Sequence, residues 1–236
     1  MINTILFDLD GTLLPMDQNV FLKAYLGGMA KKMASHGYVP EVLVDAIWKG
    51  TGAMVKNDGR CSNETLFWNV FSEIHGRDTR VDEPLFEEFY RQEFQNIRQV
   101  CGFDPRAAET VRELKSNAFR LALATNPLFP AIATHSRARW AGLDPKDFAL
   151  ITTYENSRYC KPNPEYYREI FAKLGCEGSD CIMVGNDVEE DMVPASALGA
   201  KVFLLTDCLI NKKERDITAY PHGGFAELKE FLKENI

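Results

Sequence analysis

The chain has 236 residues, enough for one large domain or for a core domain with a smaller insertion. Its formal net charge is −7, and it has no run of five or more basic residues, so we expect no nucleic acid as a structural partner. The six cysteines include no C-x-x-C pair, and no apolar stretch approaches the roughly 20 residues that span a bilayer. These features predict a soluble, cytoplasmic globular protein without membrane association.

The first part of the chain combines one strand with a long helical block. The apolar run Thr4–Leu9 is stopped by Asp10-Gly11, which predicts a buried strand. From about Asn19 to Arg98 the apolar residues recur at helical spacing only. Ser62 is a good N-cap residue for the third expected helix, and Pro84 suits the first turn of the fourth. We therefore expect four consecutive helices without a strand between them.

From Pro105 onward, helices and strands alternate. Strands are expected at Arg120–Thr125, Ala149–Thr153, Cys181–Val184 and Lys201–Leu205. Helices are expected at Pro105–Asn117, Pro130–Trp140, Pro164–Leu174, Val188–Leu198 and Phe225–Lys233. This alternation is typical of βαβ units and predicts an α/β fold with a doubly wound, Rossmann-like parallel sheet that includes the first strand. Residues 1–15 and 100–236 then form an α/β core, and residues 16–99 form an inserted helical subdomain.

Polar side chains follow several of these strands. They are Asp8 and Asp10, Thr125 and Asn126, Lys161, and the group Asn186, Asp187 and Asp191. Ligands of such sheets bind outside the carboxyl ends of the strands, so we expect these side chains to converge on one edge.

The two aspartates after the first strand have two interpretations. Asp10-Gly11 is a favoured turn dipeptide, but a turn does not explain Asp8, which lies inside the apolar run. Side chains two residues apart on a strand share a face, so both carboxylates can point to one place. Such a pair suits Mg²⁺ binding, or covalent catalysis in which one carboxylate attacks and the other transfers a proton.

The other polar residues also have ordinary structural explanations. Thr125-Asn126 before a proline forms a fair turn, but a hydroxyl and an amide can also bind phosphate oxygens. Lys161 is either a solvated loop lysine or a positive charge beside a phosphoryl group. Acids near Asp187 suit a helix N-terminus, whereas Asp187 itself closes an apolar strand and suits a metal ion.

Together these motifs resemble the haloacid dehalogenase-like (HAD) hydrolase superfamily. The resemblance rests, in the family's chain order, on FDLDGTL at Asp8 and Asp10, TN at Thr125-Asn126, KPNPEYY at Lys161 and VGNDVEEDM at Asp187 and Asp191. It covers the α/β core, and the helical insertion at residues 16–99 resembles the family's α-helical cap.

The resemblance implies covalent phosphoryl transfer. Asp8 would be the nucleophile that forms an aspartyl-phosphate, and Asp10 would protonate the leaving oxygen and then activate water. Thr125 and Asn126 would hold phosphate oxygens, and Lys161 would bind phosphate and steady the nucleophile. The resemblance assigns each of these roles to a particular residue.

The resemblance also implies Mg²⁺, bound by Asp8, the backbone carbonyl of Asp10, and Asp187, with Asp191 behind them. The family usually places an aspartate directly after the glycine of the fourth motif, where this chain has Asn186. Because a one-residue shift changes the face of a strand, the direct ligand is either Asp187 or Asn186.

Asp10 favours phosphoryl transfer over the dehalogenase and phosphonatase-like members, whose pattern lacks this acid. We therefore expect an enzyme, a Mg²⁺-dependent phosphatase that acts on a small phosphorylated metabolite. The alternatives are a mutase of the β-phosphoglucomutase type, which shares all four motifs, and a catalytically silent phosphoester-binding protein. A receiver domain would be about half as long and would lack the helical insertion. The sequence predicts neither the particular ester nor the oligomeric state.

Overall fold

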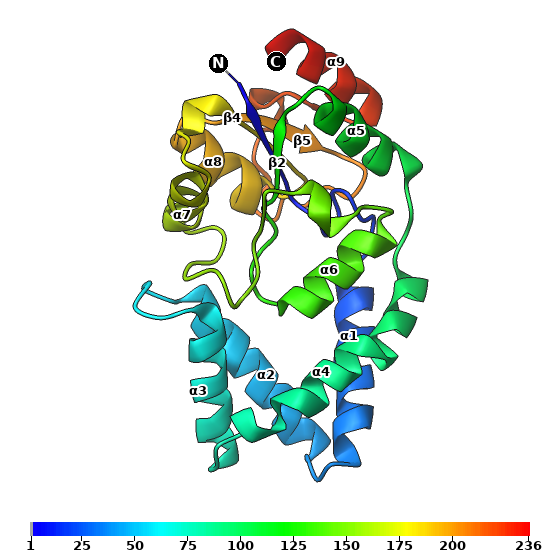
Figure 1. Cartoon of the computed structure of the whole chain (residues 1–236), viewed down its shortest axis with the longest axis vertical. Coiled ribbons are helices and arrows are strands. Elements are labelled where there is room, and N and C mark those ends of the chain that lie inside the picture. The colour runs from blue at the N-terminus through cyan, green and yellow to red at the C-terminus, as the bar shows by residue number, and fades with distance from the viewer. Residues whose placement is uncertain (1) are drawn as a thin grey trace.

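The computed structural model describes residues 2–236 and contains a six-stranded, all-parallel sheet covered by helices on both faces (Figure 1). The strand order is β3-β2-β1-β4-β5-β6, which places the first strand at the centre of the sheet. The strands are β1 (Thr4–Phe7), β2 (Arg120–Leu123), β3 (Leu150–Ile151), β4 (Cys181–Gly185), β5 (Lys201–Leu205) and β6 (His222–Gly223). The predicted doubly wound parallel sheet is confirmed.

The central strand β1 is buried on both faces. Phe7 lies opposite Leu123 of β2 and Val184 of β4. Ile5 and Phe7 pack into one apolar core, whereas Leu6 packs into the other. Burial on both faces explains the continuous apolar run, since no side chain of this strand faces water. The residues that follow β1 therefore emerge at the centre of the carboxyl edge.

Five helices cover the sheet, with α7 and α8 on one face and α5 and α9 on the other (Figure 1). They are α5 (Pro105–Ser116), α6 (Ala131–Trp140), α7 (Pro164–Leu174), α8 (Val193–Ala197) and α9 (Phe225–Asn235). The expected helix Val188–Leu198 is divided, because Val188–Met192 forms a single π-helical turn before α8. The strands at Arg120–Thr125 and Ala149–Thr153 are shorter than expected, and their last residues belong to the loops of the carboxyl edge.

The helical insertion follows β1 directly and lies at one end of the molecule (Figure 1). It contains α1 (Gln18–Ala34), α2 (Pro40–Val55), α3 (Asn63–His75) and α4 (Glu83–Arg91), with 3₁₀ turns at Arg80–Asp82 and Glu93–Val100. The Ser62 side chain accepts a hydrogen bond from the Thr65 amide and caps α3, as expected. The fourth helix ends earlier than its apolar pattern suggests, because Gln92 leaves helical geometry.

No helix within residues 2–236 combines the length and the apolar character that crossing a bilayer requires.

Candidate active site

A buried charge cluster lies at the carboxyl edge of the sheet. The Lys161 ammonium donates to Asp8 Oδ1 at 2.8 Å and to Asp191 Oδ1 at 2.6 Å. Lys161 and Asp191 are each 1% exposed, so Lys161 is not a solvated loop lysine. Burial alone would lower the pKa of Lys161, but the charges of Asp191 and Asp8 raise it well above its ordinary value. Lys161 is therefore a fixed positive charge behind Asp8.

Asp191 orders the loop that follows β4. Its second oxygen accepts the backbone N–H groups of Asn186 at 3.1 Å and Asp187 at 3.0 Å. Gly185 is required beside it, because a Cβ atom at this position would collide with the Asp191 carboxylate. Asp191 thus connects Lys161 to the loop that carries Asp187, and it touches both through hydrogen bonds.

Asp10 has a partner that the sequence motifs do not include. It forms an ion pair with Arg137 of α6, which is 1% exposed. The guanidinium carbon of Arg137 lies 4.4 Å from the ring centroid of Phe129, so the cation is held by an aromatic face as well as by a carboxylate. Burial raises the pKa of Asp10, and the charge of Arg137 opposes that effect. Asp10 Oδ1 is buried without a hydrogen-bond partner.

Thr125 and Asn126 lie in the loop after β2, beside Asp8. The backbone carbonyl of Thr125 accepts hydrogen bonds from the Thr152 and Tyr166 hydroxyl groups at 2.6 and 2.9 Å, which fixes the loop. The Asn126 side chain donates to Glu190 at 3.0 Å. Burial raises the pKa of Glu190, which lies in the π-helical turn after β4 and is absent from the expected site.

These side chains surround a cavity of about 160 Å³. Its wall includes Asp8, Asp10, Thr125, Asn126, Asp187 and Arg137. Lys161 is not part of the wall and reaches the cavity through its contact with Asp8. The structure therefore brings all of the expected site residues to one edge, and all of them except Lys161 line the cavity.

The two alternative metal ligands, Asn186 and Asp187, differ in how many of their side-chain atoms already form hydrogen bonds within the protein. Asn186 accepts from the Thr12 hydroxyl at 3.0 Å and donates to the Cys208 carbonyl at 2.6 Å, so both ends of its amide are used. Asp187 accepts two backbone N–H groups on one oxygen, which starts the following turn. Asp187 therefore retains a free oxygen for a cation.

The donors present suit Mg²⁺ better than a metal that requires a full protein cage. Within residues 2–236, no three His, Cys, Asp or Glu side chains lie close enough to bind a metal by themselves. Mg²⁺ usually takes one or two carboxylates and completes its shell with water and substrate phosphate. Asp8 and Asp187, which both line the cavity, meet that requirement.

Gly11 closes the turn that places Asp10. Its φ of 88° lies in the left-handed region, which favours glycine, and a Cβ atom there would collide with the Asn186 amide. The loops after β1 and β4 are thus packed against each other at this glycine.

Curated relatives are similar along most of their length. A glyceraldehyde 3-phosphate phosphatase of Methanothermobacter thermautotrophicus is 24% identical, with 98% of this chain and 100% of the relative covered. A ribulose-1,5-bisphosphate 5-phosphatase of Halopiger xanaduensis is 26% identical, with 86% and 84% covered. The pyrophosphatase PpaX of Bacillus cereus is 24% identical, with 85% and 81% covered.

Solved structures share the fold. A HAD phosphatase from Thermococcus onnurineus superposes with a TM-score of 0.60 at 19% identity, and 98% of each chain is covered. A 2-haloacid dehalogenase from Pseudomonas syringae gives a TM-score of 0.63 at 19% identity over 99% of each chain. A family model of haloacid dehalogenase-like hydrolases matches residues 2–199. The chain therefore belongs to the haloacid dehalogenase-like hydrolases, as its motifs predict.

Proposed function

We propose that this hydrolase is a Mg²⁺-dependent phosphatase that cleaves a small phosphate monoester through an aspartyl-phosphate on Asp8. The observation that carries the proposal is the different pairing of two carboxylates in one cavity wall. Asp8 is paired with the buried Lys161, whereas Asp10, although it is ion-paired with Arg137, has a raised pKa and one oxygen without a hydrogen-bond partner. One group thus suits a nucleophile and the other suits a proton donor.

The reaction would proceed in two displacements. In the first, Asp8 attacks phosphorus, the bond to the ester oxygen breaks, and Asp10 gives its proton to that oxygen. In the second, Asp10 takes a proton from a water molecule, which attacks the aspartyl-phosphate and releases inorganic phosphate. Asp10 ends protonated, Asp8 is regenerated as the carboxylate, and the cycle is closed.

The remaining residues would stabilise the phosphoryl group. Thr125 and Asn126 line the cavity and can donate hydrogen bonds to the oxygens of the phosphoryl group. Lys161 would hold Asp8 in place and offset the negative charge that accumulates at the nucleophile. Asp191 would position Lys161 and Asp187, because it accepts hydrogen bonds from the Lys161 ammonium and from the Asp187 backbone N–H.

Mg²⁺ would be held by Asp8, the backbone carbonyl of Asp10, and Asp187. When bound, the ion supplies the positive charge that lets a phosphate dianion approach an anionic carboxylate. Asn186 fits this role less well, since both ends of its side chain are engaged. The phosphatase relatives support the reaction class, because each is named for removing or cleaving phosphate.

The experiment measures inorganic phosphate released from p-nitrophenyl phosphate with Mg²⁺ by the wild type and Asp8→Asn. The control variant is Asp45→Asn, which changes an exposed carboxylate on α2. We expect phosphate release by the wild type and the control and none by Asp8→Asn. Equal inactivity of wild type and Asp8→Asn across a panel of esters would favour a silent binding protein. Phosphate transfer between two positions of a sugar phosphate, without release, would favour a mutase.

A further inference from the structure

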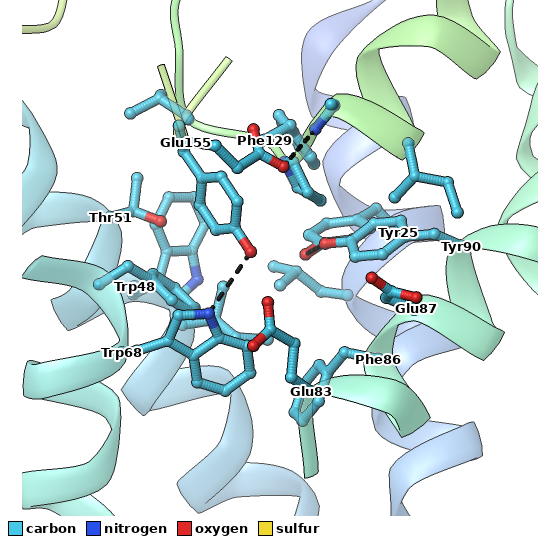
Figure 2. Close-up of a pocket in the computed structure, with 18 of the residues that line it drawn as sticks. Tyr25, Trp48, Thr51, Trp68, Glu83, Phe86, Glu87, Tyr90, Phe129 and Glu155 are labelled. Carbon is cyan, nitrogen blue, oxygen red and sulfur yellow. Dashed lines mark hydrogen bonds between the residues drawn. The ribbon is translucent and has the colours of Figure 1, made fainter. Parts of the chain in front are cut away.

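A second and larger cavity lies between the helical insertion and the core (Figure 2). Its volume is about 390 Å³, within the range of small-molecule sites. It shares Leu22, Leu128 and Phe129 with the catalytic cavity, so the two spaces adjoin. A leaving group attached to a phosphate at Asp8 would therefore extend toward this cavity.

The wall of this cavity is aromatic. Eight of its nineteen lining residues are Phe, Tyr or Trp, contributed by α1, α2, α3, α4 and the loops after β2 and β3. Figure 2 shows Tyr25 and Tyr90 on one side and Trp48 and Trp68 on the other. Trp48 is 49% exposed although it lines the cavity, so a ligand there would cover apolar surface that water now contacts. The shape and the rings suit a flat, apolar group.

The charged side chains in the wall are all acidic. They are Glu83, Glu87 and Glu155, and no lysine, arginine or histidine stands among the described residues that line the cavity. Glu87 is paired with Arg91 at 2.7 Å, and Glu155 accepts the Ala131 amide at 2.8 Å.

Glu83 differs from the other two glutamates. Its carboxylate makes no hydrogen bond or ion pair with any residue in the range 2–236, and the residue is half-buried at the start of α4. Figure 2 shows its carboxylate pointing into the cavity, toward Trp68. The Trp68 indole N–H is already bonded to the Tyr154 hydroxyl at 3.4 Å, so it does not satisfy Glu83. At Glu83 the cavity thus presents a carboxylate that has neither a hydrogen bond nor an ion pair within residues 2–236, among aromatic faces.

This arrangement discriminates between leaving groups by charge. A second phosphate or a carboxylate would lie close to glutamates without a cation to offset the repulsion, and such groups are normally bound by arginine or lysine. An ammonium group would instead meet a carboxylate and the negative faces of aromatic rings, the surroundings that bind organic cations.

We infer that this cavity receives the leaving group of the substrate, and that this group is an apolar, ring-sized body with an ammonium group at its far end. The inference rests on the proposed phosphatase function, because it assigns the substrate class of the same site. Glu83 is the specificity-determining residue: it would pair with the ammonium group, while the aromatic wall covers the apolar body.

The test compares three aryl phosphates of similar length, whose tails differ in charge. Tyramine phosphate has an ammonium tail, para-propylphenyl phosphate a neutral one, and the phosphate ester of para-hydroxyphenylpropanoate an anionic one. With Mg²⁺, we expect kcat/KM to fall in that order, by about tenfold at each step, mainly through KM. Glu83→Gln should bring the three values toward one another. Glu88→Gln, which changes a residue on the same helix outside the cavity wall, should leave the order unchanged.

Each other outcome has a definite meaning. Equal rates for the three esters, or preference for the anionic one, would overturn the inference and leave the phosphatase function standing. The same holds if none of the three is cleaved while p-nitrophenyl phosphate is. Similar losses of preference in Glu83→Gln and Glu88→Gln would show that the discrimination does not come from this cavity. Inactivity toward p-nitrophenyl phosphate as well would remove the proposed function and the inference with it.

Discussion

Arg137 is a buried cation whose ion-pair partner within residues 2–236 is Asp10, and removing it leaves a carboxylate without compensation. We expect Arg137→Met to destabilise the fold, because methionine can fill the space beside Phe129 but carries no charge. Removing one partner of a buried pair costs about 3–5 kcal/mol. The Asp10 side chain keeps 20% of its surface exposed, which places the expected loss near the lower value, about 3 kcal/mol. For a chain of this length, such a loss lowers Tm by about 6–12 °C.

A double-mutant cycle distinguishes the contribution of the Arg137–Asp10 ion pair to stability from the contribution of side-chain packing. Asp10→Asn alone leaves the Arg137 guanidinium buried without a counter-charge, so it should also destabilise. The double variant removes both charges and should lose about 2–3 kcal/mol less than the sum of the two single losses. Urea unfolding followed by circular dichroism measures all three, and Arg139→Met, two residues along and exposed, is the matched control.

Additive losses in the cycle, within about 0.5 kcal/mol, would refute the reasoning, because they would show that the two charges do not stabilise each other. A loss in Arg139→Met as large as that in Arg137→Met would refute it as well. The effect would then belong to the helix and not to the pair.

Three further predictions concern the core and the helical insertion. Lys161→Met leaves two buried carboxylates unpaired, so we expect about 3 kcal/mol lower stability and at least about 100-fold lower kcat, measured by urea unfolding and phosphate release. Chelation with EDTA should abolish turnover and Mg²⁺ restore it, and Asp187→Asn should raise the Mg²⁺ concentration for half-maximal activity at least about tenfold. Burial alone would raise the pKa of Asp82, but hydrogen bonds from Tyr38 and Arg77 lower it below the ordinary value. Its contribution to stability is therefore complete above the ordinary carboxyl pKa and is lost at lower pH, so the Tm difference between wild type and Asp82→Asn should shrink as pH falls below about 4.

The sheet was predictable because its strands are buried on both faces and therefore read as continuous apolar runs. The same property prevents a prediction of where each strand ends. Ala124, for example, continues the apolar run of β2 although the strand itself ends at Leu123. The edge strand β6 was not predicted, because its two residues, His222 and Gly223, have no strand-like composition. In the helical insertion, the apolar residues keep helical spacing beyond the end of α4 at Arg91. Phe94 and Ile97 keep helical spacing and are buried, although they lie in 3₁₀ turns.

The convergence of the motif residues was predictable from topology alone, because parallel strands deliver their ends to one edge. The partners that stabilise them come from helices, and which helical residue faces the site depends on packing. Arg137 and Arg139 illustrate this limit. They are two residues apart on α6, and nothing in the local pattern distinguishes the buried arginine beside Asp10 from the exposed one. The position of Glu190 in the site was likewise not predictable, because it belongs to an acidic cluster that a helix N-terminus explains.

The charges around the catalytic cavity argue for a cation beyond those that the chain supplies. Five carboxylates lie there, on Asp8, Asp10, Asp187, Glu190 and Asp191. Lys161 and Arg137 are buried against three of them, and the exposed Lys212 stands in the wall. Asp187 and Glu190 have no cationic partner within residues 2–236, so negative charge is in excess before any phosphate arrives. A phosphate dianion would deepen that excess, whereas a divalent ion beside Asp187 would offset it. The charges left unpaired thus support the proposed Mg²⁺ ion independently of the motif.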